Sequence, residues 1–222
     1  MRRREWLAGF SLASLQFLLL RRALALGGVE KGVARVRGDA RVNGAPAKED
    51  MDIKAGDVIT TGASGELVFV MGGDAFLVRA NARVEVQGQK GSVIAAGLRI
   101  FTGAVLSVFK PGERKTVQTS AATTGIRGTG VYVEAEERRT YVCTCYGEAE
   151  IVPVDDPSAR ETVRTRQHEQ PRYVMPKGSP RMIMGAPVIN HTDAELTLLE
   201  SLIGRQPPFA PWPGDDRKTT GY

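Results

Sequence analysis

Short segments of alternating apolar and polar residues, separated by glycine, make up the chain from Gly28 to Val152. In residues 34–42, for example, alanine and valine alternate with arginine, so one side of the segment suits a core and the other suits water. Most of the 25 glycines lie between Gly27 and Gly147, where they favour tight turns. We therefore expect a mainly β fold of many short strands, arranged as a β-roll, a solenoid-like stack or a sandwich.

One amphipathic helix is expected near the C-terminal end of the chain. Thr192 and Glu195 have the spacing of a capping box, which opens a helix, and Gly204 and Pro207 are suited to end it. The apolar residues that would share one face are Leu196, Leu199, Leu202 and Ile203. Because a helix this short is marginal alone, we expect this face to pack on the core of the same chain.

Residues 1–25 have the order of an export signal, with basic residues, then an apolar run, then a site of small residues. Arg3 and Arg4 belong to a pattern that resembles a twin-arginine signal, and Ala23 and Ala25 fit the cleavage site. We expect export to the periplasm, with an uncleaved membrane anchor as the alternative.

The positive charge of the chain is concentrated in this first segment. The whole chain has a formal net charge of +5, but residues 1–25 carry five arginines and one glutamate. Their removal leaves 25 basic and 24 acidic side chains, so a nearly neutral protein is expected after cleavage. Nucleic-acid binding, which depends on clustered positive charge, is therefore not expected, and neither is membrane attachment after cleavage.

The rest of the chain divides by composition into four parts. A β domain is expected over residues 26–153 and an irregular extension of loops and short β segments over 154–190, where prolines prevent a long regular element. The helix would occupy residues 191–205. A proline-rich tail, expected to be disordered, would follow over 206–222.

Three motifs in the β domain carry a resemblance to a known family. They are Gly-Val-Ala-Arg-Val-Arg-Gly at 32–38, Ala-Gly-Asp-Val-Ile-Thr-Thr-Gly with a further glycine at 55–65, and Thr-Ser-Ala-Ala-Thr-Thr-Gly-Ile-Arg-Gly-Thr at 119–129. In order and spacing they resemble the FecR domain. The resemblance implies an all-β module outside the cytoplasm that senses or contacts other proteins. The relay of a signal to a sigma factor is not carried over, because the chain shows neither a sigma-binding region nor a spanning helix.

Three residues of these motifs are candidates for contact with a partner. Asp57 is suited to accept backbone hydrogen bonds in a tight turn, and Arg127 lies in what we interpret as a glycine-rich turn. Thr129 closes the third motif. A structural role is the favoured interpretation for these positions, and partner contact is the alternative.

The two cysteines are Cys143 and Cys145, in an alternating segment that predicts a strand. Residues i and i+2 of a strand face the same side, so the two thiols would be neighbours. Three states are open: buried reduced thiols, a disulfide that would need a local bend because the Cα atoms would be about 6.6 Å apart, or metal ligation. For metal ligation, His168 and His191 would complete a zinc or copper(I) site, although their sequence spacing gives no reason for them to meet the cysteines.

Catalytic motifs are absent from the sequence, so we expect a protein that is not an enzyme and needs no cofactor. The leading hypothesis is a protein-interaction or sensing adaptor of the cell envelope, whose partner would be another envelope protein. The alternative is a metal- or small-ligand-binding protein, and a third possibility is a structural module of an envelope assembly. The sequence leaves the oligomeric state open.

Overall fold

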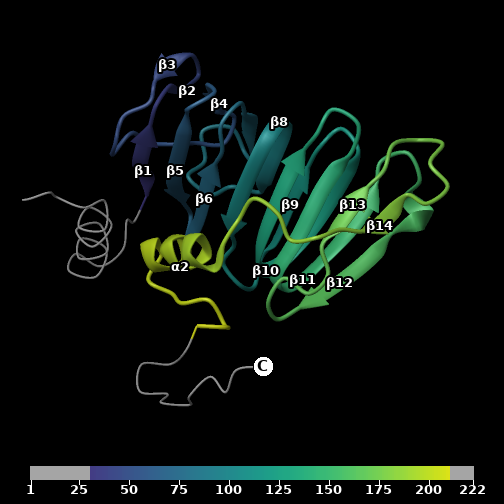
Figure 1. The fold of residues 1–222 in the computed structure, drawn as a ribbon. Helices are drawn as coiled ribbons and strands as arrows, with labels where there is room; N and C mark the ends of the chain where they lie inside the picture. The colour runs from purple at the N-terminus through teal and green to yellow at the C-terminus, as the bar shows by residue number, and fades with distance from the viewer. Residues whose placement is uncertain (1–30, 211–222) are drawn as a thin grey trace, which may run out of the picture.

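The structure, a computed structural model, describes residues 31–210. The expected export signal, with Arg3, Arg4, Ala23 and Ala25, lies outside the described residues, and so does the tail from residue 211. The strands are β1 (Gly32–Arg37), β2 (Ala40–Val42), β3 (Ala45–Pro46), β4 (Val58–Thr61), β5 (Glu66–Met71), β6 (Asp74–Val78), β7 (Arg83–Gln87), β8 (Gly97–Val108), β9 (Arg114–Gln118), β10 (Ala122–Ala135), β11 (Thr140–Pro153), β12 (Glu161–Thr165), β13 (Arg172–Val174) and β14 (Ile183–Gly185). A short 3-10 helix, η1 (Pro157–Ala159), follows β11, and one α-helix, α2 (Asp193–Leu202), follows β14 in the described part of the chain. The prediction of a mainly β fold with one C-terminal helix is confirmed (Figure 1).

Three long strands, β8, β10 and β11, each change partners halfway along their length. The first half of β8 pairs with β7 and its second half with β10. On their other edges, β10 pairs first with β9 and then with β8, and β11 pairs first with β13 and then with β12, while β10 and β11 pair with each other through both halves. At the changeover each strand has a glycine with a positive φ: Gly103 (78°), Gly128 (56°) and Gly147 (87°). Residues other than glycine rarely adopt this backbone conformation, so glycine permits these bends. As a result one continuous 14-stranded sheet folds over on itself.

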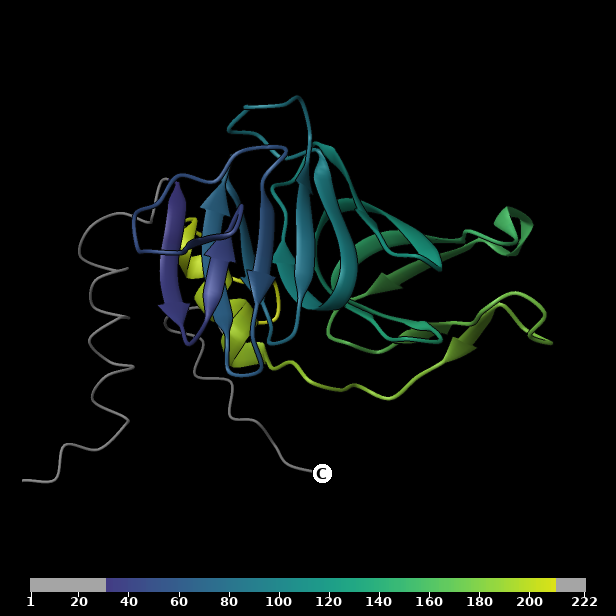
Figure 2. The ribbon, with the colours of Figure 1, turned by 90° about the horizontal axis from the view of Figure 1, so that it is seen from above.

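The folded sheet has two layers. We call one the helix-side layer, because α2 packs on its outer face, and the other the open layer. The helix-side layer contains β1, β5, β6, the second halves of β8 and β10, the first half of β11, and β13 and β14. The open layer contains β2, β3, β4, β7, β9, β12 and the remaining halves of the long strands. Figure 2 shows the folded arrangement from above, with α2 beside one layer.

Apolar residues fill two separate spaces. The main core lies between the layers and contains residues such as Phe69 and Phe76 from one layer and Val84 from the other. A second apolar cluster lies on the outer face of the helix-side layer, where Leu196 and Leu199 of α2 are fully buried. The helix-side layer is therefore buried on both faces, which explains why β5 and β6 are apolar at nearly every position.

The helix begins as its sequence predicts. Thr192 is the N-cap, its side chain accepts the backbone N–H of Glu195, and the Glu195 side chain accepts the backbone N–H of Thr192, so the capping box is confirmed. The helix ends at Leu202, and Gly204 follows with a φ of 71°. Within residues 31–210, no helix has the length and apolar character needed to cross a membrane.

The structure differs from the sequence interpretation in one place. Residues 125–130 are not a glycine-rich turn, because they belong to strand β10 and contain its bend. This difference arises from long-range pairing with β11, which the local composition of the segment does not reveal. Past residue 153, where loops and short β segments are expected, β12, β13 and β14 extend the same sheet.

Candidate metal centre

The two cysteines lie on the first half of β11, in the helix-side layer. Tyr141, Cys143 and Cys145 point to the outer face, toward the second apolar cluster, whereas Val142 points into the main core. Both thiols are fully buried and neither forms a disulfide. The prediction that they share a face is confirmed, and the space above them is closed by segments that follow β12 and β14.

His168 reaches the cysteines from the loop between β12 and β13. Its backbone N–H donates to the carbonyl of Cys145 at 2.9 Å, and its own φ is 55°. The loop turns tightly here because the Glu169 carboxylate accepts the backbone N–H groups of Arg166 and Gln167. These contacts bring the His168 ring over β11, where Nδ1 lies 3.5 Å from Sγ of Cys143.

His191 reaches the same point from the segment between β14 and α2. The hydroxyl of Tyr141 donates to the carbonyl of Pro187 and accepts the backbone N–H of Ile189, so it fixes this segment on the sheet. The His191 ring stacks on Tyr132, with centroids 4.6 Å apart and an interplanar angle of 18°. His191 Nε2 then lies 3.0 Å from Nδ1 of His168.

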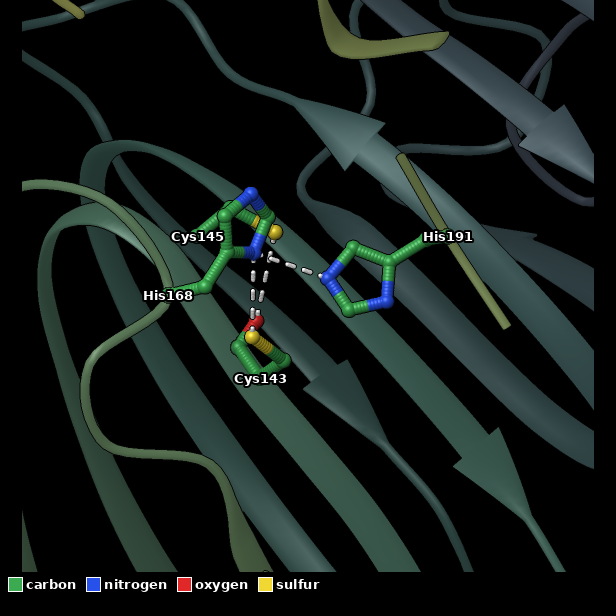
Figure 3. Close-up of side chains that lie close together, drawn as sticks. All are labelled: Cys143, Cys145, His168 and His191. Carbon is green, nitrogen blue, oxygen red and sulfur yellow. Dashed lines mark hydrogen bonds between the residues drawn. The ribbon is translucent and has the colours of Figure 1, made fainter. Parts of the chain in front are cut away.

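The four side chains converge on one point, as Figure 3 shows. The two sulfurs and the two facing ring nitrogens all lie within 4.8 Å of one another. The donor atoms of a tetrahedral zinc ion lie roughly 3.3–3.8 Å apart, given bond lengths of about 2.0–2.3 Å. The cluster therefore has the donor types and nearly the dimensions of a site for a single ion.

The far nitrogen of each histidine ring is already engaged. Nε2 of His168 lies 2.8 Å from Oδ1 of Asp193, and Nδ1 of His191 lies 2.6 Å from the carbonyl oxygen of Ile189. With an N–H donated to these oxygens, the other nitrogen of each ring faces the cluster and can bind a metal ion when it carries no proton. Metal-binding histidines are oriented by such contacts with carboxylates and carbonyls.

The cluster also sets the protonation of its sulfurs. The hydrogen bond from Cys145, together with those from His168 and His191, lowers the pKa of Cys143 to about 4. Burial raises the pKa of Cys145, and the hydrogen bond with Cys143 raises the pKa of His168. One sulfur is therefore held as the thiolate, the form that binds metals.

Solvent has little access to the four ligands. His191 is 8% exposed and the side chain of His168 is 11% exposed, while both cysteines are completely buried. An ion held by all four would have no open coordination position. This arrangement is typical of structural sites, since catalytic zinc sites keep one position for water or substrate.

The other candidate residues lie away from this cluster. Asp57 accepts hydrogen bonds from the side chain of Asn43 and the backbone N–H of Lys54, so the prediction that it accepts a backbone hydrogen bond is confirmed. Arg127 is exposed on β10, and Thr129 lies on the same strand. Partner contact by these residues stays a prediction.

Asp193 is a site residue that the sequence did not reveal. It is the first residue of α2, where an acidic residue is ordinary because it complements the helix dipole. Its carboxylate also accepts a hydrogen bond from the side chain of Gln167 at 2.6 Å. Its place in the capped first turn gives no sequence signal for its contacts with Gln167 and His168, because these contacts depend on the path of the loop that follows β12.

No family model matches the chain, and no curated protein matches it. Two crystal structures of a "putative anti-sigma factor" from Parabacteroides distasonis are similar to it, each with 14% sequence identity and a TM-score of 0.47. Each alignment covers 58% of this chain and 59% of the other, so the match spans less than two thirds of that protein. The FecR resemblance stays a prediction.

Proposed function

We propose that this protein binds one zinc ion through Cys143, Cys145, His168 and His191. The observation that carries the proposal is the convergence of all four donor atoms within 4.8 Å, from three separate segments. The donor set of two sulfurs and two imidazole nitrogens is that of many structural zinc sites. The site is closed by four protein ligands, so we assign the ion a structural or regulatory role and not a catalytic one.

Metal analysis of purified protein tests this proposal. The protein should be isolated without a polyhistidine tag, stripped with a chelator and then titrated with zinc and, under reducing conditions, with copper(I). We expect one zinc ion per chain, and no binding by the variant Cys143→Ser/Cys145→Ser. Thr144→Ser is the matched control, because Thr144 lies between the cysteines but on the strand's other face, and it should bind as the wild type does. Protein that takes up no zinc, or that binds copper(I) alone, would rule out the proposal.

The contact between Asp193 and His168 gives a second prediction. Asp193→Asn keeps all four ligands but replaces the carboxylate that orients the His168 ring. We expect one zinc ion still to bind, with affinity lower by about 10- to 100-fold, as is usual when such a partner is lost. Competition with a zinc-binding dye measures the affinity. An unchanged dissociation constant would mean that Asp193 does not orient His168 for an ion.

A second candidate function is contact with another protein of the cell envelope, as the FecR resemblance and the export signal suggest. The observation in its favour is Phe101, which is 41% exposed on the open layer between Arg83 and Arg99. The guanidinium carbons of these arginines lie 5.3 and 5.1 Å from the ring centroid. Exposed aromatic residues and arginines are enriched at protein interfaces.

Crosslinking in the periplasm tests this second function and the expected location together. We expect fractionation to recover the chain in the periplasm, and crosslinking to recover one protein that is lost with Phe101→Ala. The matched control is Val154→Ala, since Val154 is an apolar residue with a similar exposed fraction. Equal recovery of the same proteins with the wild type, Phe101→Ala and Val154→Ala would contradict a binding role for Phe101.

A further inference from the structure

We propose that zinc controls how firmly the segment 187–202 is docked on the helix-side layer. This inference rests on the proposed zinc site. We call the segment the clasp: it comprises the connection from Pro187 to Thr192 and helix α2. Binding of the ion would keep the clasp closed over the sheet, and loss of the ion would allow it to open while the rest of the fold stays intact.

The ligands are divided between the sheet and the clasp. Cys143 and Cys145 belong to β11, whereas His191 is the residue before the N-cap of α2. Asp193, the first residue of the helix, holds His168 on the opposite side of the cluster. An ion bound to all four residues therefore links the start of α2 directly to the sheet, and the clasp cannot open without breaking this link.

Without the ion, the start of the clasp is held on the sheet by polar contacts at its surface and by packing. Tyr141 hydrogen-bonds to Pro187 and Ile189, and the side chain of Asn190 donates to Glu134. Arg79 donates to the carbonyl of Asn190 at 2.9 Å and forms an ion pair with Glu195 at 2.8 Å. The side chains of both partners are about one quarter exposed, so solvent weakens this ion pair. A ten-residue helix is marginal by itself, and its stability depends on packing.

Opening would uncover an apolar surface. Leu196 and Leu199 are fully buried against the second cluster, which includes Val70, Leu77 and Leu106 of the helix-side layer. The main core lies on the other side of this layer and makes no use of the clasp. The two apolar clusters are thus separated by a sheet, which is the arrangement that allows one to open without the other.

Hydrogen–deuterium exchange on the wild-type chain, with and without zinc, tests the inference. In metal-free protein we expect the amides of α2 to exchange at least about tenfold faster than those of β8, because the clasp opens separately. Free zinc at about 100 times its dissociation constant should slow exchange in α2 by about 100-fold, since opening requires release of the ion. Cys143→Ser/Cys145→Ser in zinc should resemble metal-free wild type, and Thr144→Ser should respond as wild type does.

The outcomes separate this inference from the proposed function. If zinc binds with one ion per chain but α2 and β8 exchange at the same rate in metal-free protein, the clasp is part of a single cooperative unit and the inference is wrong, while the zinc site stands. If zinc binds and leaves exchange in α2 unchanged, the inference is also wrong. If no zinc binds, both proposals fail.

Discussion

Zinc is expected to raise the melting temperature of the metal-free protein by roughly 8 to 16 °C when its free concentration is about 1,000 times the dissociation constant. An ion that binds the folded state alone contributes about 4.1 kcal/mol at that concentration. For a chain of this size each kcal/mol shifts the midpoint by about 2–4 °C. Four ligands from three segments cannot converge in the unfolded chain, so zinc should stabilise the folded protein by nearly this full amount. Differential scanning calorimetry of chelated and zinc-loaded protein measures the shift.

The control for this measurement is the Cys143→Ser/Cys145→Ser variant. The chain contains two cysteines and two histidines, all of them in the cluster, so the variant leaves no alternative pair of sulfur ligands. We expect its melting temperature to be the same with and without zinc, while Thr144→Ser keeps the full shift. A shift below about 2 °C in the wild type would contradict the account, because it corresponds to less than about 1 kcal/mol. So would an equal shift in the double variant.

Lys115→Met is expected to lower the free energy of unfolding by about 3–5 kcal/mol, as loss of one partner of a buried ion pair does. The Lys115 side chain is 2% exposed, and its Nζ lies 3.3 Å from Oδ2 of the fully buried Asp74. Nζ also donates to the carbonyl of Ala95 at 2.7 Å and pairs with Glu113 at 2.6 Å. Burial raises the pKa of Asp74, and removal of Lys115 would leave this carboxyl without its cation. Denaturant unfolding at a fixed zinc concentration measures the loss.

A double variant distinguishes loss of the ion pair from simple loss of packing. Asp74→Asn still accepts the backbone N–H of Lys110, the hydrogen bond that Asp74 makes at 2.7 Å, but it carries no charge. Lys115→Met/Asp74→Asn should therefore be more stable than Lys115→Met alone, because no unpaired charge stays buried. If the two substitutions are additive, or if Lys115→Met costs less than about 1 kcal/mol, the ion pair does not hold this part of the fold.

Local patterns in the sequence predict the elements of this protein better than their assembly. The capping box at Thr192 and Glu195 predicts the start of α2, because its hydrogen bonds involve neighbouring residues alone. The bends of the long strands are different. Gly128 is typical of a turn by composition, but it forms a bend inside β10 because both halves of that strand pair with β11. Glycine is compatible with a turn and with a bend inside a strand, and pairing with the partner strand decides which of the two forms.

The metal centre, too, can be predicted from the sequence only in part. Alternation in a strand is enough to place Cys143 and Cys145 on one face. Nothing near His168 or His191 in the sequence indicates that they meet above that face. Their convergence depends on contacts between distant segments, such as the hydrogen bonds of Tyr141 to Pro187 and Ile189. The pairing of β12 with β11, which starts the loop that carries His168, is another such contact.

X-ray absorption spectroscopy at the zinc edge tests the central claim most directly, because it reports the atoms bound to the ion. For the zinc-loaded wild type we predict two sulfur neighbours at about 2.3 Å and two nitrogen neighbours at about 2.0–2.1 Å, with the multiple-scattering pattern of imidazole. A first shell of nitrogen and oxygen without sulfur would place the ion elsewhere on the protein. That result would contradict the assignment of Cys143, Cys145, His168 and His191 as its ligands.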